Sequence, residues 1–414
     1  MSKSRQEGES PFLNPFRPGA GHAPPWLAGR TNEQQEFERL LGQTPVSENL
    51  IITGLRGVGK TVLLETLRPL ARAADWLWVG ADLSESASLR EDHLAVRLCT
   101  DLAPLTSGFA VTVEHRQEPG FGGQEVAVEQ RLDYQTLRRL YQESPGLSVD
   151  QLKTVLQATW RVLSAAPSKP RGIVFAYDEA QNLSDQPRHE EFPVALLLDC
   201  FQSLQRQGLP LMLVLVGLPT LFPKLVASRT YAERMFRVRF LDRLSEAESE
   251  EAILKPVSDA RCPLRLTDDS VRTIIQMSGG YPYFIQFICR EVYDVFTQRA
   301  DRGQTASVPV AEIEQKLDTD FFSGRWSRLT DRQRELLWVV AHLDHSDGEF
   351  SVRDIVQGSA ALSKPFSASH VNQMLSNLAA QGLVFKNRHG RYSFAVPLLD
   401  RFIQRQTIAA DERA

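Results

Sequence analysis

The chain has 414 residues, 42% of them hydrophobic, which is enough for two or three domains, each with a core of its own. Its 47 lysines and arginines nearly balance 51 aspartates and glutamates, and the net charge is −4. Any contact with nucleic acid must therefore come from a local patch. No apolar run approaches the roughly 18 to 20 residues of a membrane span, and the first residues lack the apolar stretch of a signal peptide. We expect a soluble, cytoplasmic protein without membrane contact.

The cysteines argue against a metal ribbon, a redox dithiol or a secreted disulfide framework. They are Cys99, Cys200, Cys262 and Cys289, widely spaced and without a CxxC pair. The histidines are also scattered without metal-ligand spacing, so the side chains alone predict no metal centre.

The N-terminal part of the chain is rich in proline and glycine over residues 1–28, which predicts an extended segment. A helix is expected next, over residues 32–41, because Phe37, Leu40 and Leu41 are spaced as one helical face.

Short apolar runs separated by helical stretches predict a parallel sheet in an α/β core over residues 29–243. Their near-continuous apolarity is typical of strands buried on both faces, and they cover residues 49–53, 76–80, 172–177, 211–216 and 236–240.

One segment interrupts this core. Residues 109–114 and 125–129 alternate apolar and polar side chains around a glycine-rich stretch, which predicts a β-hairpin inserted at about residues 107–130.

The C-terminal part of the chain predicts two further domains. Helical patterns predict a helical lid over residues 244–322. Three short helices and a two-stranded hairpin follow over residues 323–408, the pattern of a winged-helix domain.

A glycine-rich loop follows the first predicted strand. Residues 54–61 read Gly-Leu-Arg-Gly-Val-Gly-Lys-Thr, the complete Walker A pattern between an apolar strand and a helix. Such glycines let backbone N–H groups turn toward phosphates, and the helix N-terminus attracts the same anion. We expect ATP or ADP here, with Lys60 on the β- and γ-phosphates and the Thr61 hydroxyl on Mg²⁺. The predicted nucleotide contacts are Gly54, Arg56, Gly57, Val58, Gly59, Lys60, Thr61 and Val62.

A pair of acidic residues follows the strand at 172–177. Ligands of open α/β sheets bind at the carboxyl ends of the strands, so Asp178 is predicted to hold Mg²⁺ through water. Glu179 is placed to orient or polarise an attacking water, and with Lys60 and Asp178 it makes up the expected catalytic set. Two acids at one strand end favour hydrolysis, although nucleotide binding alone stays open.

These motifs, taken in order, resemble AAA+ ATPases, and more narrowly bacterial ATP-binding proteins related to origin-recognition ATPases. The resemblance covers nearly the whole chain, through residues 14–16, 24–30, 54–61, 178–183, 217–219, 231–236, 279–284 and the C-terminal pattern. It implies a three-layer P-loop core, with Gly29 and Arg30 at the adenine end of the pocket. It also implies an arginine that reaches a neighbouring subunit's γ-phosphate, for which Arg234 is the first candidate and Arg229 the second. A polar sensor is expected after Val216, but Gly217-Leu218-Pro219 intervene before Thr220.

The lid departs from the AAA+ pattern. Where an arginine is expected, Gly280-Tyr281-Pro282 looks like the lid motif of STAND ATPases, which implies that Pro282 contacts nucleotide. Two hypotheses therefore stay open. One is a MgATP-hydrolysing AAA+ ATPase that couples nucleotide state to binding and assembly. The other is a STAND-like signalling switch or scaffold that hydrolyses ATP slowly, binds a partner protein and makes no direct contact with DNA.

The predicted winged helix leaves its own alternatives open. Double-stranded DNA is one partner, because the third helix is polar and the wing carries Lys386, Arg388 and Arg391. The charge from residue 325 onward, 12 basic against 9 acidic side chains, is only mildly favourable for a polyanion. Packing against the lid or a partner protein, or a homo-oligomer, is the other interpretation.

Overall fold

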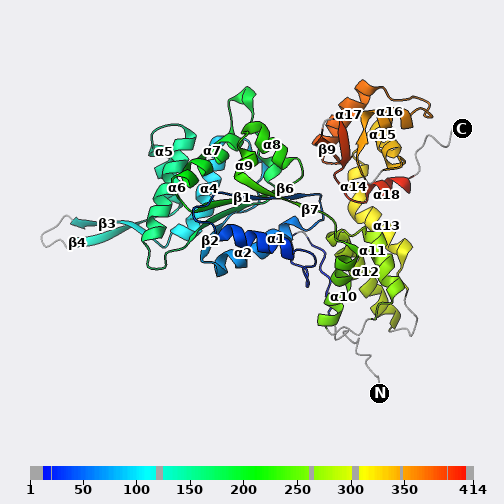
Figure 1. Cartoon of the computed structure of the whole chain (residues 1–414), viewed down its shortest axis with the longest axis horizontal. Helices are drawn as coiled ribbons and strands as arrows, with labels where there is room; N and C mark the ends of the chain where they lie inside the picture. Colours follow the sequence, from blue (N-terminus) through cyan, green and yellow to red (C-terminus); the bar gives the residue numbers. More distant parts are fainter. Residues whose placement is uncertain are drawn as a thin grey trace, which may run out of the picture. The chain divides into compact units, whose positions relative to one another are not determined.

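The computed structural model describes residues 13–19, 21–117, 125–260, 265–300, 307–345, 348–388 and 390–406. The chain divides into two compact units. We call Thr31–Gly54 with Leu63–Phe240 the sheet unit, and Met1–Arg30 with Leu55–Val62 and Leu241–Ala414 the lid unit. Figure 1 shows the secondary structure of both units along the chain.

A five-stranded sheet, with strand order β2-β5-β6-β1-β7, forms the centre of the sheet unit. Its strands are β1 (Asn49–Gly54), β2 (Trp76–Val79), β5 (Gly172–Tyr177), β6 (Leu211–Gly217) and β7 (Phe236–Leu241). β1 pairs parallel with β6, which pairs parallel with β5, and β5 pairs parallel with β2. Each of β1, β5 and β6 is buried along its whole length, as their continuous apolarity predicts. The predicted parallel α/β sheet is confirmed.

β7 differs from the sequence prediction. It was expected to be buried on both faces, but only its two ends are buried, and Phe240 is 56% exposed. The reason is its position at the edge of the sheet, where a strand has one neighbour instead of two. Glu36 of α1 accepts ion pairs there from Arg237 at 3.0 Å and Arg239 at 2.6 Å.

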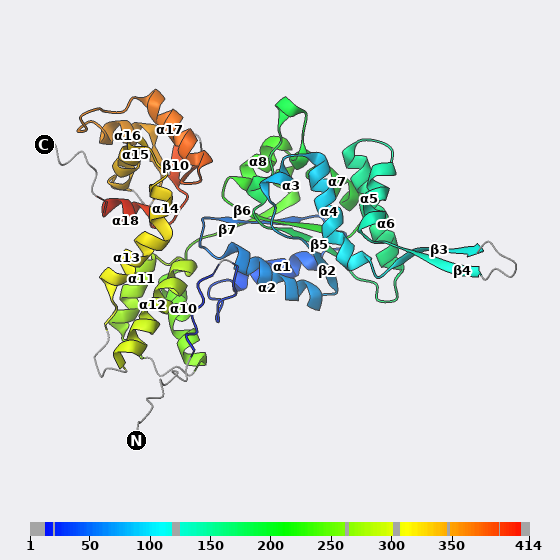
Figure 2. The same ribbon diagram turned by 180° about the vertical axis from the view of Figure 1, so that it is seen from behind.

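Helices cover both faces of this sheet, so the unit has three layers (Figures 1 and 2). α1 (Thr31–Leu41) and α2 (Lys60–Ala73) lie on one face, and α4 (Glu91–Thr106), α6 (Ser148–Ala165) and α7 (Pro193–Arg206) lie on the other. The Phe37 ring meets Trp78 of β2 edge-on, with 6.1 Å between ring centroids. The shorter helices are α3 (Glu85–Ser88), α5 (Tyr134–Glu143), α8 (Leu221–Ser228) and α9 (Ala232–Met235), with 3₁₀ turns η1 (Ala180–Asn182) and η2 (Pro187–His189).

The predicted insertion is a hairpin in the structure. β3 (Ala110–Gln117) and β4 (Glu125–Arg131) pair antiparallel, separately from the main sheet. The glycine-rich stretch that was predicted to join them lies outside the described residues.

After β7, the described part of the lid unit consists of four helices, α10 to α13, followed by a C-terminal group of helices with a small sheet. The helices are α10 (Glu246–Asp259), α11 (Asp268–Ser278), α12 (Pro282–Ala300), α13 (Val310–Leu317), a π-helical turn η3 (Asp318–Phe322), α14 (Ser323–Trp326), α15 (Asp331–Ala341), α16 (Val352–Gly358), α17 (Ala368–Ala380) and α18 (Leu399–Gln404). The sheet has the order β8-β10-β9, with β8 (Phe350–Ser351), β9 (Val384–Arg388) and β10 (Arg391–Phe394). The three helices and the hairpin strands predicted here are present, whereas β8 and α18 were not predicted. In the described part of the chain, no helix is both long and apolar enough to span a membrane.

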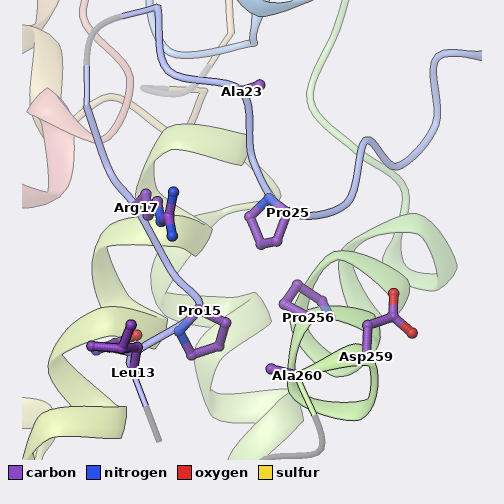
Figure 3. A pocket seen from close by; sticks show the side chains of 9 residues that line it. Leu13, Pro15, Arg17, Ala23, Pro25, Pro256, Asp259 and Ala260 are labelled. Atoms are coloured by element: carbon purple, nitrogen blue, oxygen red, sulfur yellow. The ribbon is translucent and has the colours of Figure 1, made fainter.

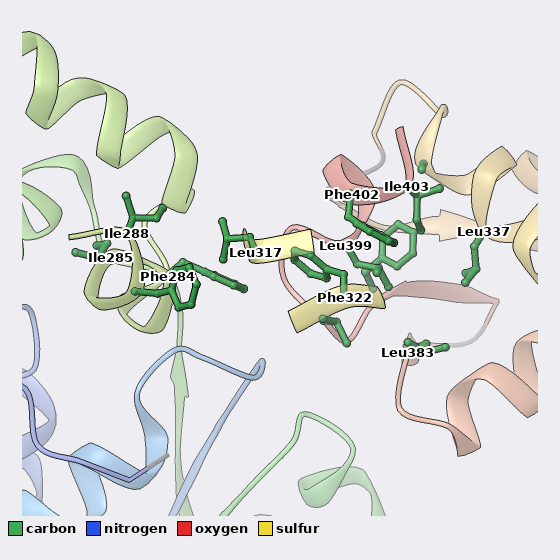
Figure 4. Packing of buried hydrophobic residues seen from close by; sticks show 14 of the residues in the cluster. Phe284, Ile285, Ile288, Leu317, Phe322, Leu337, Leu383, Leu399, Phe402 and Ile403 are labelled. Carbon is green, nitrogen blue, oxygen red and sulfur yellow. The ribbon is translucent and has the colours of Figure 1, made fainter. Parts of the chain in front are cut away.

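One hydrophobic cluster runs through the lid unit from α12 to α18 (Figure 4). The Phe322 ring of η3 stacks on Phe402 of α18 at 5.1 Å between centroids and lies 6.2 Å from Phe284 of α12. Because all three rings are buried, the lid helices and the C-terminal helices share a core rather than forming two separate ones.

Candidate nucleotide site

The glycine-rich loop joins β1 to α2 directly, since β1 ends at Gly54 and α2 begins at Lys60. Gly57 and Gly59 have φ values of 79° and 89°, in the left-handed region that other residues rarely adopt. A Cβ added to Gly59 would have no atom within 4 Å, so the loop is open at that residue. This geometry gives a helix N-terminus next to an uncovered backbone turn, which is the local structure that binds phosphate.

The side chains of this loop point in different directions. Lys60 Nζ donates a hydrogen bond to the Leu55 carbonyl at 2.8 Å, which holds the ammonium group over the loop. Val58 is buried, whereas Arg56 is exposed. The Lys60 ammonium group therefore stays close to its own loop, while the Arg56 guanidinium lies near Gly382, as described below.

Arg30 holds the loop to the chain around it. Its buried guanidinium donates to the carbonyls of Gly29 at 3.1 Å, Val58 at 2.9 Å and Asp242 at 3.0 Å. Gly29 has φ +64°, and a Cβ there would collide with Glu248 at 2.6 Å. The sequence predicted that both residues line the adenine end of the pocket. In the structure, these bonds make Arg30 a clamp on the backbone of the Walker A loop.

The residue that follows the Gly-Tyr-Pro motif of the lid contacts the same loop. Pro282 is the first residue of α12, and the next N–H, that of Tyr283, donates to the Gly57 carbonyl at 3.1 Å. Gly280 has φ +77°, and its carbonyl accepts from the Leu244 N–H at 2.8 Å. Pro282 begins the helix whose N-terminal turn touches the Walker A loop, so its predicted role at the nucleotide is compatible with its place.

Arg56 reaches the C-terminal part of the lid unit, which the sequence did not predict. A Cβ added to Gly382, in the turn between α17 and β9, would stand 3.5 Å from Arg56 Nη2. Burial, and next the charge of Arg56, lower the pKa of Arg325 on α14. The Arg325 guanidinium lies 4.6 Å from the centre of the Phe321 ring. No local sequence pattern predicts that Arg56 lies near Gly382 and Arg325, because these residues are more than 250 positions away from it.

Asp178 and Glu179 follow β5 directly, as the sequence predicted. Asp178 is buried, and its Oδ1 accepts from the Glu179 N–H at 2.7 Å. Glu179 is exposed and has φ +51°, a conformation that non-glycine residues adopt mainly at turns and functional sites. Since β5, β6 and β1 are parallel neighbours, Asp178 and Gly54 close strands that end at the same edge of the sheet.

The end of β6 lacks the expected polar sensor. Gly217 is the last residue of β6, and Thr220 precedes α8 without capping it through its side chain. The polar group at this place comes from another segment, because the Leu218 N–H donates to Oε1 of Gln181 at 3.1 Å. Sequence reasoning did not single out Gln181, although it stands only two residues beyond Glu179.

The two arginine candidates differ in their surroundings. Arg234 is exposed on α9. Arg229 is held by Asp199 of α7, which accepts from Nε at 2.9 Å and from Nη2 at 2.8 Å. This bidentate ion pair makes Arg229 the weaker candidate for reaching another subunit.

A cavity of about 500 Å³ lies beside the proline-rich N-terminal segment in the lid unit (Figure 3). Neither Gly29 nor Arg30 lines it. The lining residues come from that segment and from the end of α10 and are Leu13, Asn14, Pro15, Arg17, Ala23, Pro25, Pro256, Asp259 and Ala260.

Two parts of the chain match known family models. A family model described as AAA ATPase domain matches residues 27–227, and a domain family of unknown function matches residues 319–403. A Walker-type ATPase of Pyrococcus abyssi is similar in structure, with a TM-score of 0.58 and 15% identity over 91% of this chain and 96% of that one. For the ORC2 protein of Aeropyrum pernix with ADPNP and ADP, the TM-score is 0.49 and the identity 13%, over 92% of this chain and 94% of that one. For DnaA of Aquifex aeolicus with AMPPCP, the TM-score is 0.40 and the identity 11%, over 94% of this chain and 97% of that one.

At such identities the likeness to the Pyrococcus protein concerns the fold alone. No curated protein matches the chain. The family match covers the Walker A loop and the Asp178-Glu179 pair, and it extends through the strands that carry them. Residues 27–227 of this chain therefore resemble an AAA ATPase domain.

Proposed function

We propose that this protein binds MgATP, hydrolyses it to ADP and phosphate, and couples its nucleotide state to binding of DNA or a partner protein. One observation carries the proposal. The strand that leads into the Walker A loop and the strand that leads into Asp178-Glu179 are parallel and end at one edge of the same sheet. Ligands of open α/β sheets bind at that edge.

The residues fit a nucleotide with Mg²⁺. The open turn at Gly59 has room for phosphate oxygens, and Lys60 supplies a positive charge. The Thr61 hydroxyl and the Asp178 carboxylate are oxygen donors, the type that Mg²⁺ prefers. Among the described residues, no cluster of three or more His, Cys, Asp and Glu side chains is arranged to hold a metal by itself. The metal would neutralise charge on the phosphates.

Hydrolysis is assigned to Glu179. Its exposed carboxylate, held in a left-handed turn directly after the buried Asp178, is suited to orient a water for attack on the γ-phosphate. Arg234 is proposed to complete the site of a second copy of the chain, because it is exposed and a fixed guanidinium stabilises transition-state charge.

The test is ATP turnover by Glu179→Gln. We expect kcat to fall roughly 100-fold while ATP still binds, because the amide cannot act as a base but keeps the shape of the side chain. Glu190→Gln is the matched control, since Glu190 is also exposed and has φ +56°. Equal turnover by wild type and Glu179→Gln would remove Glu179 from catalysis.

Coupling is supported by contacts within the lid unit. The Walker A loop touches α12 through Gly57 and Tyr283, and it approaches the turn before β9 through Arg56 and Gly382. A change in this loop on nucleotide binding can therefore bias the C-terminal helices directly.

The C-terminal helices and hairpin are proposed to be a winged helix that binds duplex DNA. One face of α17 is apolar and buried, and the other consists of exposed polar side chains, namely Ser369, His370, Asn372, Gln373, Ser376 and Asn377. Such a face can hydrogen-bond to base edges.

Among the described side chains, the predicted wing offers fewer free groups for DNA contact than the sequence suggested. Lys386 is exposed, but Asn387 donates to Ser393 Oγ at 2.7 Å and Arg391 lies 3.5 Å from Asp354. The side chain of Arg388 and all of His389 lie outside the described residues.

A STAND-like switch is the second candidate, favoured by the contact between the Walker A loop and Tyr283, the residue that follows the Gly280-Tyr281-Pro282 motif. A monomer that retains ADP tightly would support it, whereas ATP-dependent assembly that requires Arg234 would support the ATPase. The cytoplasmic location stays a prediction from the sequence.

A further inference from the structure

Gln181, in the turn after β5, uses both ends of its side-chain amide. Its Nε2 group donates a hydrogen bond to Oε2 of Glu179, and its Oε1 accepts from the Leu218 N–H at 3.1 Å. One side chain thus connects the Glu179 carboxylate to the main chain that leaves β6. Gly217 and Leu218 bring no polar side chain of their own to this point.

The turn that carries Gln181 is itself fixed. Its backbone carbonyl accepts from Lys224 Nζ of α8 at 2.5 Å, and burial lowers the pKa of this half-buried lysine. A Cβ on Gly217 would lie 2.6 Å from Gln181 Oε1 and 3.2 Å from the Gln181 nitrogen. The glycine at the end of β6 is therefore what allows the glutamine turn to approach so closely.

We propose that Gln181 is the positioning residue for Glu179. The inference rests on the proposed ATP hydrolysis and adds a part to it. Glu179 is exposed and sits in a left-handed conformation, so its backbone alone leaves the carboxylate free to rotate about the side-chain bonds. The amide of Gln181 holds one carboxylate oxygen and thereby sets the direction of the other, which is the oxygen available to a water. Orientation of this kind contributes to rate without contributing to nucleotide affinity.

Gln181→Met tests this, because methionine has a similar length but lacks both hydrogen-bonding groups. We expect kcat to fall roughly tenfold or more, while the dissociation constant for ATP changes less than about twofold. In the Glu179→Gln background the same substitution should cause no further loss, since two residues that act as a unit are not additive.

Gln181→Glu is the second variant. It keeps an acceptor for the Leu218 N–H but replaces the donor to Glu179 by a like charge, so kcat should again fall. Gln157→Met is the matched control, because Gln157 also makes a side-chain hydrogen bond, to Gln207 at 2.7 Å, near the opposite end of β6.

The outcomes separate this inference from the proposed function. Unchanged kcat in both Gln181 variants, with Glu179→Gln inactive, overturns the role of Gln181 alone. Losses that add fully in the double variant overturn it as well. A wild-type protein without ATP turnover would overturn the proposed hydrolysis and, with it, the role of Gln181. Circular dichroism and ATP binding verify that each variant is folded; if Gln181→Met does not fold, Gln181→Glu decides.

Discussion

Asp199 on α7 shows how tertiary contacts change the chemistry of one residue. It accepts two hydrogen bonds from Arg229 and a third from the Tyr231 hydroxyl at 2.5 Å. Burial acts to raise the pKa of its carboxyl, but the hydrogen bonds from Arg229 and Tyr231 outweigh burial and hold this pKa below its ordinary value of 3.8. The folded state is therefore stabilised by ionised Asp199 at pH values above about 3.8, and this contribution is lost as the pH falls below it.

Replacing Asp199 by Asn should reduce stability at pH 7 by about 1 kcal/mol, because solvent reaches about a third of both side chains and screens the pair. The difference from wild type should shrink as the pH falls below about 3.8 toward 3, because the unfolded state then takes up the proton that the lowered pKa keeps off folded Asp199. Urea denaturation between pH 7 and pH 3 measures both effects. Glu233→Gln, an exposed neutralisation on α9, should show neither. A difference that persists at pH 3 would contradict the electrostatic explanation.

At the scale of elements, β1 is held in the sheet by a buried polar residue that its apolar pattern conceals. Asn49 is fully buried, and its Nδ2 donates to Gln205 Oε1 at 3.2 Å and to the Met235 carbonyl at 3.2 Å. Its Oδ1 accepts from Gln205 Nε2 and from the Leu213 N–H, each at 2.8 Å. One side chain thus ties the start of β1 to α7, β6 and the residue before β7.

We expect Asn49→Ala to destabilise the protein by roughly 2–4 kcal/mol, because it leaves buried groups of Gln205, Leu213 and Met235 without partners. The free energy of unfolding, from urea titration, measures the loss. Asn32→Ala, at an exposed position of α1, is the control and should change stability by less than about 0.5 kcal/mol. A similar small effect for Asn49→Ala would mean that water satisfies these groups.

Most elements were predictable because each of them carries its own signal. Continuous apolar runs identified β1, β5 and β6, and the loop pattern fixed the start of α2. β7 was misjudged, since the sequence of a strand does not state how many neighbours it has. The two-residue strand β8 was missed, because it is a strand only through its pairing with β10.

At the scale of the whole molecule, the lid unit brings the Walker A loop together with residues near the C-terminus. Tyr283 contacts Gly57 through its backbone, and its ring lies 5.5 Å from Phe321, beside the Phe322 ring that stacks on Phe402. A continuous packed path therefore leads from the loop to α18. Close-packed aromatic side chains do not deform continuously. They shift between discrete packing arrangements instead.

We expect duplex DNA to bind with an affinity that differs roughly fivefold or more between the ATP and ADP states, and Arg56→Ala to remove most of this ratio. The reason is that the Arg56 side chain of the loop lies beside the turn before β9. Fluorescence anisotropy with labelled duplex, over a salt series, measures the ratio and its ionic part.

Arg353→Ala is the control, because this exposed arginine lies on α16; it can weaken binding but should leave the ratio unchanged. No salt-sensitive binding at low ionic strength would contradict the DNA hypothesis and leave the partner protein. If Arg56→Ala kept the ratio of DNA affinities between the ATP and ADP states, coupling through Arg56 and Gly382 would be contradicted.

The parallel α/β core, the phosphate loop and the acidic pair after β5 could all be predicted from the sequence alone. These features are local, since glycine conformations, strand apolarity and neighbouring carboxylates are written in consecutive residues. Three contacts could be seen only once the chain was folded: Arg30 clamps the loop, Arg56 lies near Gly382, and Gln181 donates a hydrogen bond to Glu179. Each of these depends on where a side chain ends in space, and that position follows from packing between distant segments rather than from any local pattern.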